Sequence, residues 1–373
     1  MGRNMFMDKE TLGLYIHVPF CTRKCPYCSF YSVPNEKNLV NKYIAALCKE
    51  IQKWGKKTDF EVDTIYFGGG TPSVLKTEEL LKIIFCIKDN FKIMYPEVTI
   101  EINPGDYKNL DFEKLCYYGV NRISLGAQAI NDSALKILGR RHSAQDITDS
   151  IEIIKNSKIK NISLDLIIGS PEQKTSDICD FIYFCKENNI PHISSYILKI
   201  EENTPYYFNK DNLVFYSEDK LADFYFYTCA VMRKFGYFHY EISNFSKKGF
   251  ESRHNLKYWN LDNYLGLAPS AHSLFCGKRF YYANDLSGFI MDPKVTFEGD
   301  FEPEKELIML SLRTCDGLTN QKFKNKLGKD IPKIYFERAK KFENYGFLEC
   351  KNDSIKLTEK GFLVSNSIIS EIL

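Results

Sequence analysis

Short runs of apolar and β-branched residues recur along the first two thirds of the chain, and segments with helical periodicity separate them. In the segment from Thr77, for example, apolar residues return every three or four positions after a Thr-Glu-Glu start, which is typical of an amphipathic helix. Strands that alternate with helices predict β/α units and a parallel sheet. The predicted strands begin near residues 12, 63, 98, 122, 162 and 192, so six units fit residues 12 to about 235.

Functional side chains are expected at one end of this sheet. Right-handed crossover connections would close six units into a full or partial barrel, with functional loops at the carboxyl ends of the strands. An ordinary strand-to-helix turn explains any one polar residue or glycine there, but their joint placement favours a binding site. The residues concerned are Cys21, Gly68–Gly70, Glu101, Asn103, Gln128 and Asp165.

The last third of the chain follows a different pattern. After residue 245 the sequence becomes irregular and aromatic, and we expect residues 246–300 to form an irregular connecting segment packed on the core. From Glu302 onward, three helix-like segments precede a predicted two-stranded hairpin and a final helix. We therefore expect an α/β core over residues 1–245 and a C-terminal winged-helix-like α+β extension over residues 301–373.

Composition and charge argue against a nucleic-acid partner. The 373 residues include 50 Lys and Arg and 48 Asp and Glu, a formal net charge of +2. In residues 301–373, 13 basic residues are interleaved with 11 acidic ones, whereas a DNA-binding domain normally presents a strongly basic face. We expect this tail to pack on the core or cover a substrate, and nucleic-acid binding is kept as a third hypothesis.

The sequence indicates a cytoplasmic protein. Its first ten residues are polar, and no run approaches the roughly 18 apolar residues that span a bilayer, so we expect neither a secretion signal nor a transmembrane segment. Nine of the twelve cysteines are scattered among apolar or mixed segments, which suits reduced thiols better than a disulfide framework. The other three, Cys21, Cys25 and Cys28, are clustered.

The clustered cysteines have the spacing Cys-x3-Cys-x2-Cys, which fits one short loop with converging sulfur atoms. A structural zinc ion would need a fourth ligand, from His17 or a distant cysteine, and a disulfide would leave one thiol over. A [4Fe-4S] cluster on three thiolates keeps one iron open, which is an advantage where a substrate must coordinate iron. Phe30 stands where a fourth cysteine would close such a site.

This spacing, with Tyr27 immediately before the last cysteine, resembles the signature of the radical S-adenosylmethionine (SAM) superfamily. The resemblance implies a partial (β/α)6 barrel, a [4Fe-4S] cluster bound by Cys21, Cys25 and Cys28, and an electron donor for that cluster. In that superfamily the amine and carboxylate of SAM complete the open iron, and an electron from the cluster cleaves SAM to a 5′-deoxyadenosyl radical.

The same resemblance assigns the SAM contacts. The turn "FGGGTPS" at 67–73 allows a close backbone approach to a ligand. Glu101 is the expected polar partner of the amino acid end of SAM, and for Arg140 an exposed helix charge is the alternative of equal weight. The implied contacts are Tyr15, Tyr27, Gly70, Thr71, Glu101, Gln128, Arg140 and Asp165.

Further motifs narrow the family. The segments "YIHVPFC", "GGGTPS", "EINPG", "RISLGAQ", "LGRRH", "DLIIGSPEQ" and "YEISNF" occur in this order. They resemble the oxygen-independent coproporphyrinogen III oxidase-like family over nearly the full length, including the C-terminal tail. One group in this family decarboxylates two propionates of coproporphyrinogen III, and the other consists of haem chaperones.

Three features favour the chaperone group. The oxidases carry another cysteine two positions after the third, where this chain has Phe30, and a longer arm before the cluster, where only 20 residues precede Cys21. The third feature is "HNLKYW" at residues 254–259, which matches the His-Asn-x-x-Tyr-Trp motif of the chaperones.

By this resemblance His254 is the candidate haem ligand. Asn255 would orient its imidazole, and Tyr258 and Trp259 would offer flat apolar surface to a porphyrin. A packed aromatic loop with a structural histidine is the alternative explanation of the motif.

One segment departs from the family pattern. In "YLGLAPSAHS" at 264–273, Ala268 and Ser270 stand where relatives tend to have glycines, so the loop there is expected to approach a ligand less closely. His272 is kept as an alternative residue on the haem side.

Two functions from different classes follow. The first is a haem chaperone that transfers haem to an acceptor protein and carries a SAM-coordinated [4Fe-4S] cluster. The second is an oxygen-independent coproporphyrinogen III dehydrogenase, in which a deoxyadenosyl radical abstracts hydrogen from each propionate and CO2 is then lost. We favour the first, without coproporphyrinogen oxidase activity, and leave open whether SAM is turned over.

Overall fold

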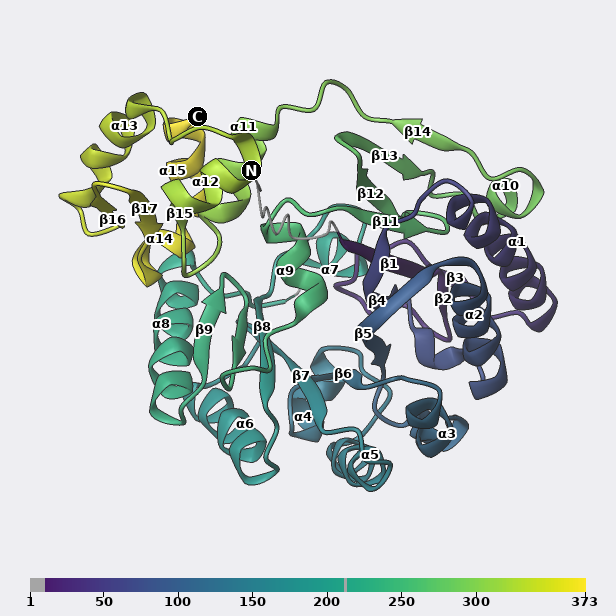
Figure 1. The fold of residues 1–373 in the computed structure, drawn as a ribbon. Helices are drawn as coiled ribbons and strands as arrows, with labels where there is room; N and C mark the ends of the chain where they lie inside the picture. Colours follow the sequence, from purple (N-terminus) through teal and green to yellow (C-terminus); the bar gives the residue numbers. More distant parts are fainter. Residues whose placement is uncertain (1–10, 211–212) are drawn as a thin grey trace.

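The computed structural model describes residues 11–210 and 213–373. Its centre is a curved sheet in which six parallel strands lie side by side (Figure 1). The arrangement confirms the α/β class and the predicted partial (β/α)6 barrel. In sheet order the strands are β1 (Thr11–Val18), β4 (Glu61–Gly69), β5 (Lys92–Ile102), β6 (Arg122–Gln128), β7 (Asn161–Ile168) and β8 (His192–Ile197).

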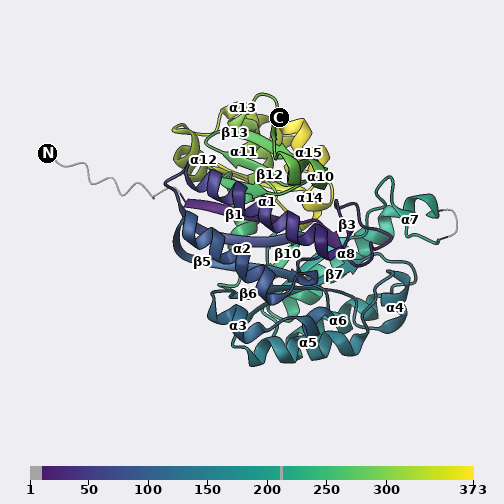
Figure 2. The same ribbon diagram turned by 90° about the vertical axis from the view of Figure 1, so that its right-hand side faces the viewer.

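Helices cover the outer face of the sheet, as the turned view in Figure 2 shows. The longer helices present an apolar stripe to the strands, for example Ile44, Leu47 and Ile51 in the first helix, all of which are buried. Burial of these stripes supplies most of the driving force for docking the helices. The covering helices are α1 (Lys37–Gly55), α2 (Thr77–Asn90), α3 (Phe112–Tyr117), α4 (Asp132–Ile137), α5 (Ala144–Asn156), α6 (Thr175–Glu187) and α8 (Glu218–Lys234). The short α7 (Pro205–Phe208) projects from this layer and contacts the segment of the clustered cysteines, where Tyr206 N donates to Pro26 O at 3.0 Å (Figure 2).

The cysteine loop connects β1 to α1. Two very short strands, β2 (Phe20–Cys21) and β3 (Val33–Pro34), pair in parallel and close the loop at its base. Gly70 N donates to Val18 O at 2.9 Å and Thr71 N to Phe20 O at 2.8 Å, so the turn after β4 is fastened to the same segment. The loop is therefore held at the carboxyl ends of β1 and β4.

Residues 246–300 correct the expectation of an irregular segment. Strand β11 pairs in parallel with β1, and the following three strands extend the sheet beyond it. Strands of three to five residues are too short to show alternation in the sequence. The elements from residue 238 onward are β9 (Phe238–Glu241), β10 (Asn244–Ser246), α9 (Arg253–Trp259), β11 (Tyr264–Leu267), β12 (His272–Phe275), β13 (Lys278–Tyr282), α10 (Leu286–Met291) and β14 (Val295–Phe297).

The C-terminal part has the expected winged-helix-like pattern. Three helices precede a hairpin, and a short strand joins the hairpin to make a separate sheet with the order β15-β17-β16. The elements are α11 (Pro303–Ser311), β15 (Leu318–Thr319), α12 (Asn320–Leu327), α13 (Lys333–Glu343), β16 (Leu348–Lys351), β17 (Ser354–Leu357), α14 (Glu359–Leu363) and α15 (Ser365–Ile372). The exact boundaries of the three predicted segments stay a prediction.

Within the described residues, no helix has both the length and the apolar character needed to cross a membrane. The polar segment 1–10, which carried the expectation about a secretion signal, lies outside the described residues.

Candidate cofactor site

The three clustered cysteines lie at the carboxyl-terminal end of the barrel strands and are partly exposed. Cys28 N donates to Cys25 O at 3.2 Å, which closes a tight turn between the second and third cysteines. The Sγ atom of Cys21 lies 3.3 Å from Thr71 Oγ1. The first cysteine thus contacts the glycine-rich turn that was predicted to bind SAM.

Arg140 connects the cysteine loop to the barrel. Its guanidinium donates to Cys25 Sγ at 3.1 Å, to Tyr27 OH at 3.3 Å, to Asn103 Oδ1 at 2.5 Å and to Gly126 O at 2.8 Å. A side chain with these four bonds is not a solvated helix charge, which was the alternative considered for it. Because a guanidinium is always protonated, it stabilises a thiolate beside it.

The turn after β4 leaves no room for side chains. A Cβ atom added to Gly70 would lie 2.7 Å from Phe20 O and 2.8 Å from Val18 O, both backbone atoms. Gly69 has φ of +105°, in the left-handed region that favours glycine. The predicted SAM turn is thus fixed by close packing against the cysteine segment.

Two carboxyl groups lie inside the barrel. Burial raises the pKa of Glu101 to about 7, with the charge of Asp165 acting in the same direction and the hydrogen bond from Tyr66 opposing it. Burial likewise raises the pKa of Asp165 to about 6, against hydrogen bonds and nearby arginines. Tyr66 OH donates to Glu101 Oε1 at 2.7 Å. Buried carboxyls with raised pKa are typical of sites that bind a charged ligand.

Tyr15 and Gln128 complete the set of predicted SAM residues. The ring of Tyr15 lies 6.2 Å from that of Tyr66, centre to centre, and its hydroxyl is 3.1 Å from His17 Nδ1. Gln128 ends β6 with φ of 69°, a left-handed conformation. Its side-chain nitrogen lies 3.2 Å from where a Cβ on Gly126 would stand, beside the Arg140 guanidinium.

Sequence reasoning missed Arg122. Its side chain is only 2% exposed, and it exerts an electrostatic effect on the buried groups Tyr66, Glu101 and Asp165. A charge at the first position of a strand gives no sign of burial in the sequence, since the same pattern is typical of a solvated strand end.

The cysteine loop fits a [4Fe-4S] cluster better than a single zinc ion. The sulfur atoms of Cys21, Cys25 and Cys28 do not all lie within 4.8 Å of one another, although all three belong to the described residues. A tetrahedral ion with bonds of about 2.3 Å needs closer ligands. His17, the suggested fourth ligand, already contacts Tyr31 O through Nε2 at 3.1 Å and Tyr15 OH through Nδ1.

His254 lies at the other end of the barrel from the cysteines. Its backbone N donates to Glu97 Oε1 at 3.1 Å, and Lys257 on the same helix, α9, binds Asp63 and Thr11 at the start of the strands. The side chain of His254 is 1% exposed. Figure 1 shows α9 within the arc of the strands.

Both ring nitrogens of His254 have hydrogen-bond partners. Nδ1 lies 2.8 Å from Thr64 Oγ1, and Nε2 lies 2.8 Å from Tyr258 OH. The ring stacks on Tyr66 at 5.1 Å between centres, and Tyr66 in turn binds Glu101. Burial lowers the pKa of His254 to about 3, so the imidazole is neutral. The predicted haem residue is therefore connected to the SAM region through Tyr66.

His272 occupies a more open position on β12. Its side chain is 59% exposed, with Nδ1 2.9 Å from Glu298 Oε1, and its ring stacks on Tyr281. In the loop before it, Ala268 and Ser270 have φ of 89° and 68°. Glycine favours such φ values. This explains why relatives tend to have glycines at the positions of Ala268 and Ser270.

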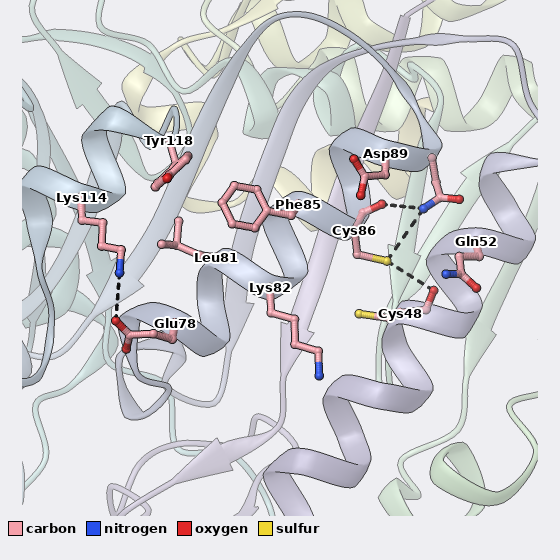
Figure 3. A pocket seen from close by; sticks show the side chains of 11 residues that line it. Cys48, Gln52, Glu78, Leu81, Lys82, Phe85, Cys86, Asp89, Lys114 and Tyr118 are labelled. Atoms are coloured by element: carbon pink, nitrogen blue, oxygen red, sulfur yellow. Dashed lines mark hydrogen bonds and ion pairs between the residues drawn. The ribbon is translucent and has the colours of Figure 1, made fainter.

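A cleft in the outer helix layer holds none of the predicted site residues. It has a volume of about 580 Å³ and lies between α1 and α2, as Figure 3 shows. Cys86 Sγ lies 3.5 Å from Cys48 O on its wall.

Comparison with known families agrees with the site. Residues 15–185 match the model of the Radical SAM superfamily, and residues 302–364 match that of the HemN C-terminal domain. The barrel, the three-cysteine loop at its end and these matches define a radical SAM protein. Membership in this superfamily implies a [4Fe-4S] cluster and SAM.

Full-length relatives identify the particular family. Heme chaperone HemW of Lactococcus lactis subsp. lactis is 33% identical over 98% of this chain and 98% of its own length. Heme chaperone HemW of Bacillus subtilis is 31% identical over 96% of this chain and 98% of its own length. The chain belongs to the HemW family of radical SAM proteins.

A solved structure shares the complete fold. The structure described as "Coproporphyrinogen III oxidase (HemN) from Escherichia coli is a Radical SAM enzyme" has a TM-score of 0.82 and covers 100% of this chain and 93% of its own. At 18% identity this likeness concerns the fold alone.

Proposed function

We propose that this protein binds haem and transfers it to acceptor proteins in the cytoplasm, while carrying a [4Fe-4S] cluster with SAM at the open iron. The observation that carries the proposal is the similarity to proteins named Heme chaperone HemW over 98% of this chain. Phe30, at the position of the extra cysteine of the oxidases, is 65% exposed and supports the same assignment. The proposed partners are haem, a haem-acceptor protein and an electron donor.

The residues at the carboxyl end of the barrel would hold the cluster and SAM. Cys21, Cys25 and Cys28 would each bind one iron, and Arg140 would fix the second thiolate and offset its charge. When bound, the cluster and SAM supply one-electron chemistry. Thr71, whose hydroxyl lies 3.3 Å from Cys21 Sγ, would contact the methionyl end of SAM beside the cluster.

The buried carboxyls would recognise the charges of SAM. SAM carries a sulfonium and an ammonium, and a cation placed near Glu101 or Asp165 would favour the ionised carboxylate. Thr71, Tyr15, Tyr27 and Gln128 line the same region in our proposal. These side chains orient the ligand and exclude water from it.

Two histidines are candidate ligands of the haem iron, and they need different structural changes before they can bind it. His254 carries the family motif, but its Nε2 would have to exchange Tyr258 OH for iron, and α9 would have to move. His272 is exposed and needs only to leave Glu298. We keep His254 as the proposed ligand because a neutral imidazole is the form that binds iron.

A second candidate function is oxygen-independent coproporphyrinogen III dehydrogenase. The match of residues 302–364 to the HemN C-terminal domain favours it. An anaerobic assay with SAM and a reductant separates the two functions. Porphyrinogen product above that of a sample without the cluster supports the dehydrogenase, and none excludes it.

A transfer assay tests the chaperone function. Reconstituted protein is loaded with one equivalent of haem, passed over a desalting column and mixed with apomyoglobin as a model acceptor. We expect the acceptor's absorption band to grow as the donor's band falls. Protein that retains no haem through the column would contradict the proposal. The control is the same protein without added haem.

A further inference from the structure

A second group of metal-binding side chains lies where the barrel meets the C-terminal domain. One ligand atom from each of Cys229, His239 and Glu359 lies within 4.8 Å of the other two. No other group of three or more His, Cys, Asp or Glu within residues 11–210 and 213–373 meets this criterion. The three belong to neither the cysteine loop nor the candidate haem motif.

Three elements bring these residues together. Cys229 lies on α8, His239 on β9 and Glu359 at the first position of α14. Figure 1 shows α14 beside the end of α8 and near β9. The backbone joins the same parts, since Cys315 N donates to Tyr240 O at 3.0 Å. The group is therefore built at a junction and not by one flexible loop.

The imidazole of His239 lacks the partners that a buried ring normally has. Its ring stacks on Phe245 with centres 4.1 Å apart, and Phe362 meets it edge-on at 5.3 Å. Nδ1 and Nε2 are both buried, and neither has a hydrogen-bond partner. The backbone of Glu241 and Ile242 passes close to the ring, but it makes no well-aligned hydrogen bond with either nitrogen.

An imidazole left in this state is costly. A buried polar atom without a partner has lost its hydration with no compensation, and a missing water or ion is one explanation of such an atom in a native protein. A neutral imidazole offers the lone pair of one ring nitrogen to a metal. The orphaned nitrogens are thus a second observation, independent of the proximity of the three side chains.

The remaining side chains complete a ligand set. Cys229 is 2% exposed. Arg233 forms an ion pair with Glu359 through Oε1, which leaves Oε2 for another partner. The thiol of Cys315 contacts the backbone carbonyl of His239, so a second sulfur stands beside the group. Thiol, imidazole and carboxylate together are the ligands that proteins use for zinc.

We propose that Cys229, His239 and Glu359 bind a zinc-class divalent cation, and that Cys315, which lies outside this group but contacts the His239 carbonyl, moves in as the fourth ligand. Sulfur and imidazole ligands select such an ion over magnesium or calcium, which prefer oxygen. Tetrahedral zinc with bonds of about 2.0–2.3 Å places its ligands about 3.5 Å apart, which lies within the 4.8 Å limit that the three ligand atoms meet. The bound ion would join the barrel to the C-terminal domain.

An entry path lies beside the group. A cleft of about 580 Å³ opens between the same elements and is lined by all four proposed ligands. Arg233, Lys356 and Lys360 also line it. An ion can therefore reach the ligands from solvent without unfolding of the junction, as a metal site requires.

Cobalt(II) is the probe that tests the site, because its spectrum reports thiolate ligation. The full-length chain with Cys21→Ala, Cys25→Ala and Cys28→Ala removes the cluster thiols from the measurement. We expect this protein to bind one equivalent of Co2+ with a sulfur-to-cobalt charge-transfer band that Zn2+ abolishes. His239→Ala and Cys229→Ser should each weaken binding by about tenfold or more. Cys276→Ser, an exposed cysteine elsewhere, should bind as before.

Circular dichroism checks whether His239→Ala folds. If it does not fold, the nearly isosteric Cys229→Ser variant tests the site instead. A cobalt spectrum without the sulfur band, or one unchanged in Cys229→Ser, would overturn the proposal. Absence of Co2+ binding at neutral pH would do the same. A haem spectrum that changes in His239→Ala while the cobalt spectrum stays the same would show that the cleft binds haem instead.

Discussion

The guanidinium of Arg140 donates a hydrogen bond to Cys25 Sγ at 3.1 Å. Through its other bonds to Asn103 Oδ1 and Gly126 O, the same side chain is fixed to β6 and to the loop after β5. The position of the second cysteine therefore depends on the barrel interior. A cluster thiolate formed there would have a permanent positive charge beside it.

Replacing Arg140 should destabilise the protein. Arg140→Gln removes hydrogen bonds to buried acceptors and so leaves these acceptors without a donor. A hydrogen bond to a charged group contributes about 1.5–3 kcal/mol. We expect the free energy of unfolding in urea to fall by that amount, and iron retention after anaerobic reconstitution to fall as well. The matched control is Arg141→Gln, because Arg141 is half-exposed and lies 3.8 Å from Asp106. An equal loss in both variants would contradict the account.

The turn at Gly70 should tolerate no side chain. In Gly70→Ala the new methyl group would clash with two backbone oxygens, those of Phe20 and Val18, and the turn would shift away from the cysteine segment. Overpacking of this kind costs about 1–3 kcal/mol. We expect a lower free energy of unfolding and weaker SAM binding by calorimetry.

Gly299→Ala is the control for that substitution, since a Cβ at Gly299 would meet nothing within 4 Å. It should change stability by less than about 0.5 kcal/mol. If Gly70→Ala behaved in the same way, the close packing of the turn would have no energetic role.

Glu101 should make stability depend on pH. Its pKa is raised from 4.5 to about 7 in the folded protein, chiefly by burial. Between these two values the folded state holds more protons than the unfolded state, so the free energy of unfolding falls as pH rises. The stabilisation that comes from protonated Glu101 is fully present below pH 4.5 and is lost as pH rises through about 7.

Glu101→Gln isolates this contribution. The variant cannot ionise, so its stability relative to the wild type should improve between pH 5 and pH 8, by an amount on the order of a few kcal/mol. Urea unfolding at the two pH values, without SAM, gives the comparison. If the variant and the wild type differ in free energy of unfolding by the same amount at pH 5 and at pH 8, Glu101 ionises freely in the folded protein.

Tyr258 should compete with haem for His254. In Tyr258→Phe the ring stays but the hydroxyl 2.8 Å from His254 Nε2 is gone, which frees the nitrogen. If His254 is the ligand, haem affinity should rise about fivefold, the value of one ordinary hydrogen bond, whereas His254→Ala should lose the ligand's absorption signature. Haem titration followed by absorbance measures both.

Tyr95→Phe, at an exposed position, is the control and should bind haem as the wild type does. Equal weakening by Tyr258→Phe and His254→Ala would mean that both residues only support the fold. Loss of the signature in His272→Ala alone would move the ligand to β12.

Much of the barrel can be predicted because its strands are short, mainly apolar runs, such as residues 162–169, that end in glycine or polar residues. The cysteine spacing and the turn at Gly70 are local in sequence, so their proximity follows once the strands are parallel. The buried position of His254 is not local. It depends on how seven-residue α9 docks against the starts of β1 and β4.

The second group of metal-binding side chains could not be predicted either, because its residues are also far apart in the sequence. Cys229, His239 and Glu359 come from three elements, and the last is separated from the others by most of the C-terminal third of the chain. No fixed spacing signals such a site. Arg122 was missed because one charge at the start of a strand is ordinarily solvated.

The central claim is that this radical SAM protein binds haem as a chaperone and does not convert coproporphyrinogen. The most direct measurement is a haem titration of the anaerobically reconstituted protein, read by absorbance, with coproporphyrinogen turnover assayed on the same sample. The account predicts saturation at a stoichiometric amount of haem and no porphyrin product. Porphyrin product without a saturable haem band would contradict it and would assign the protein to the oxidase group.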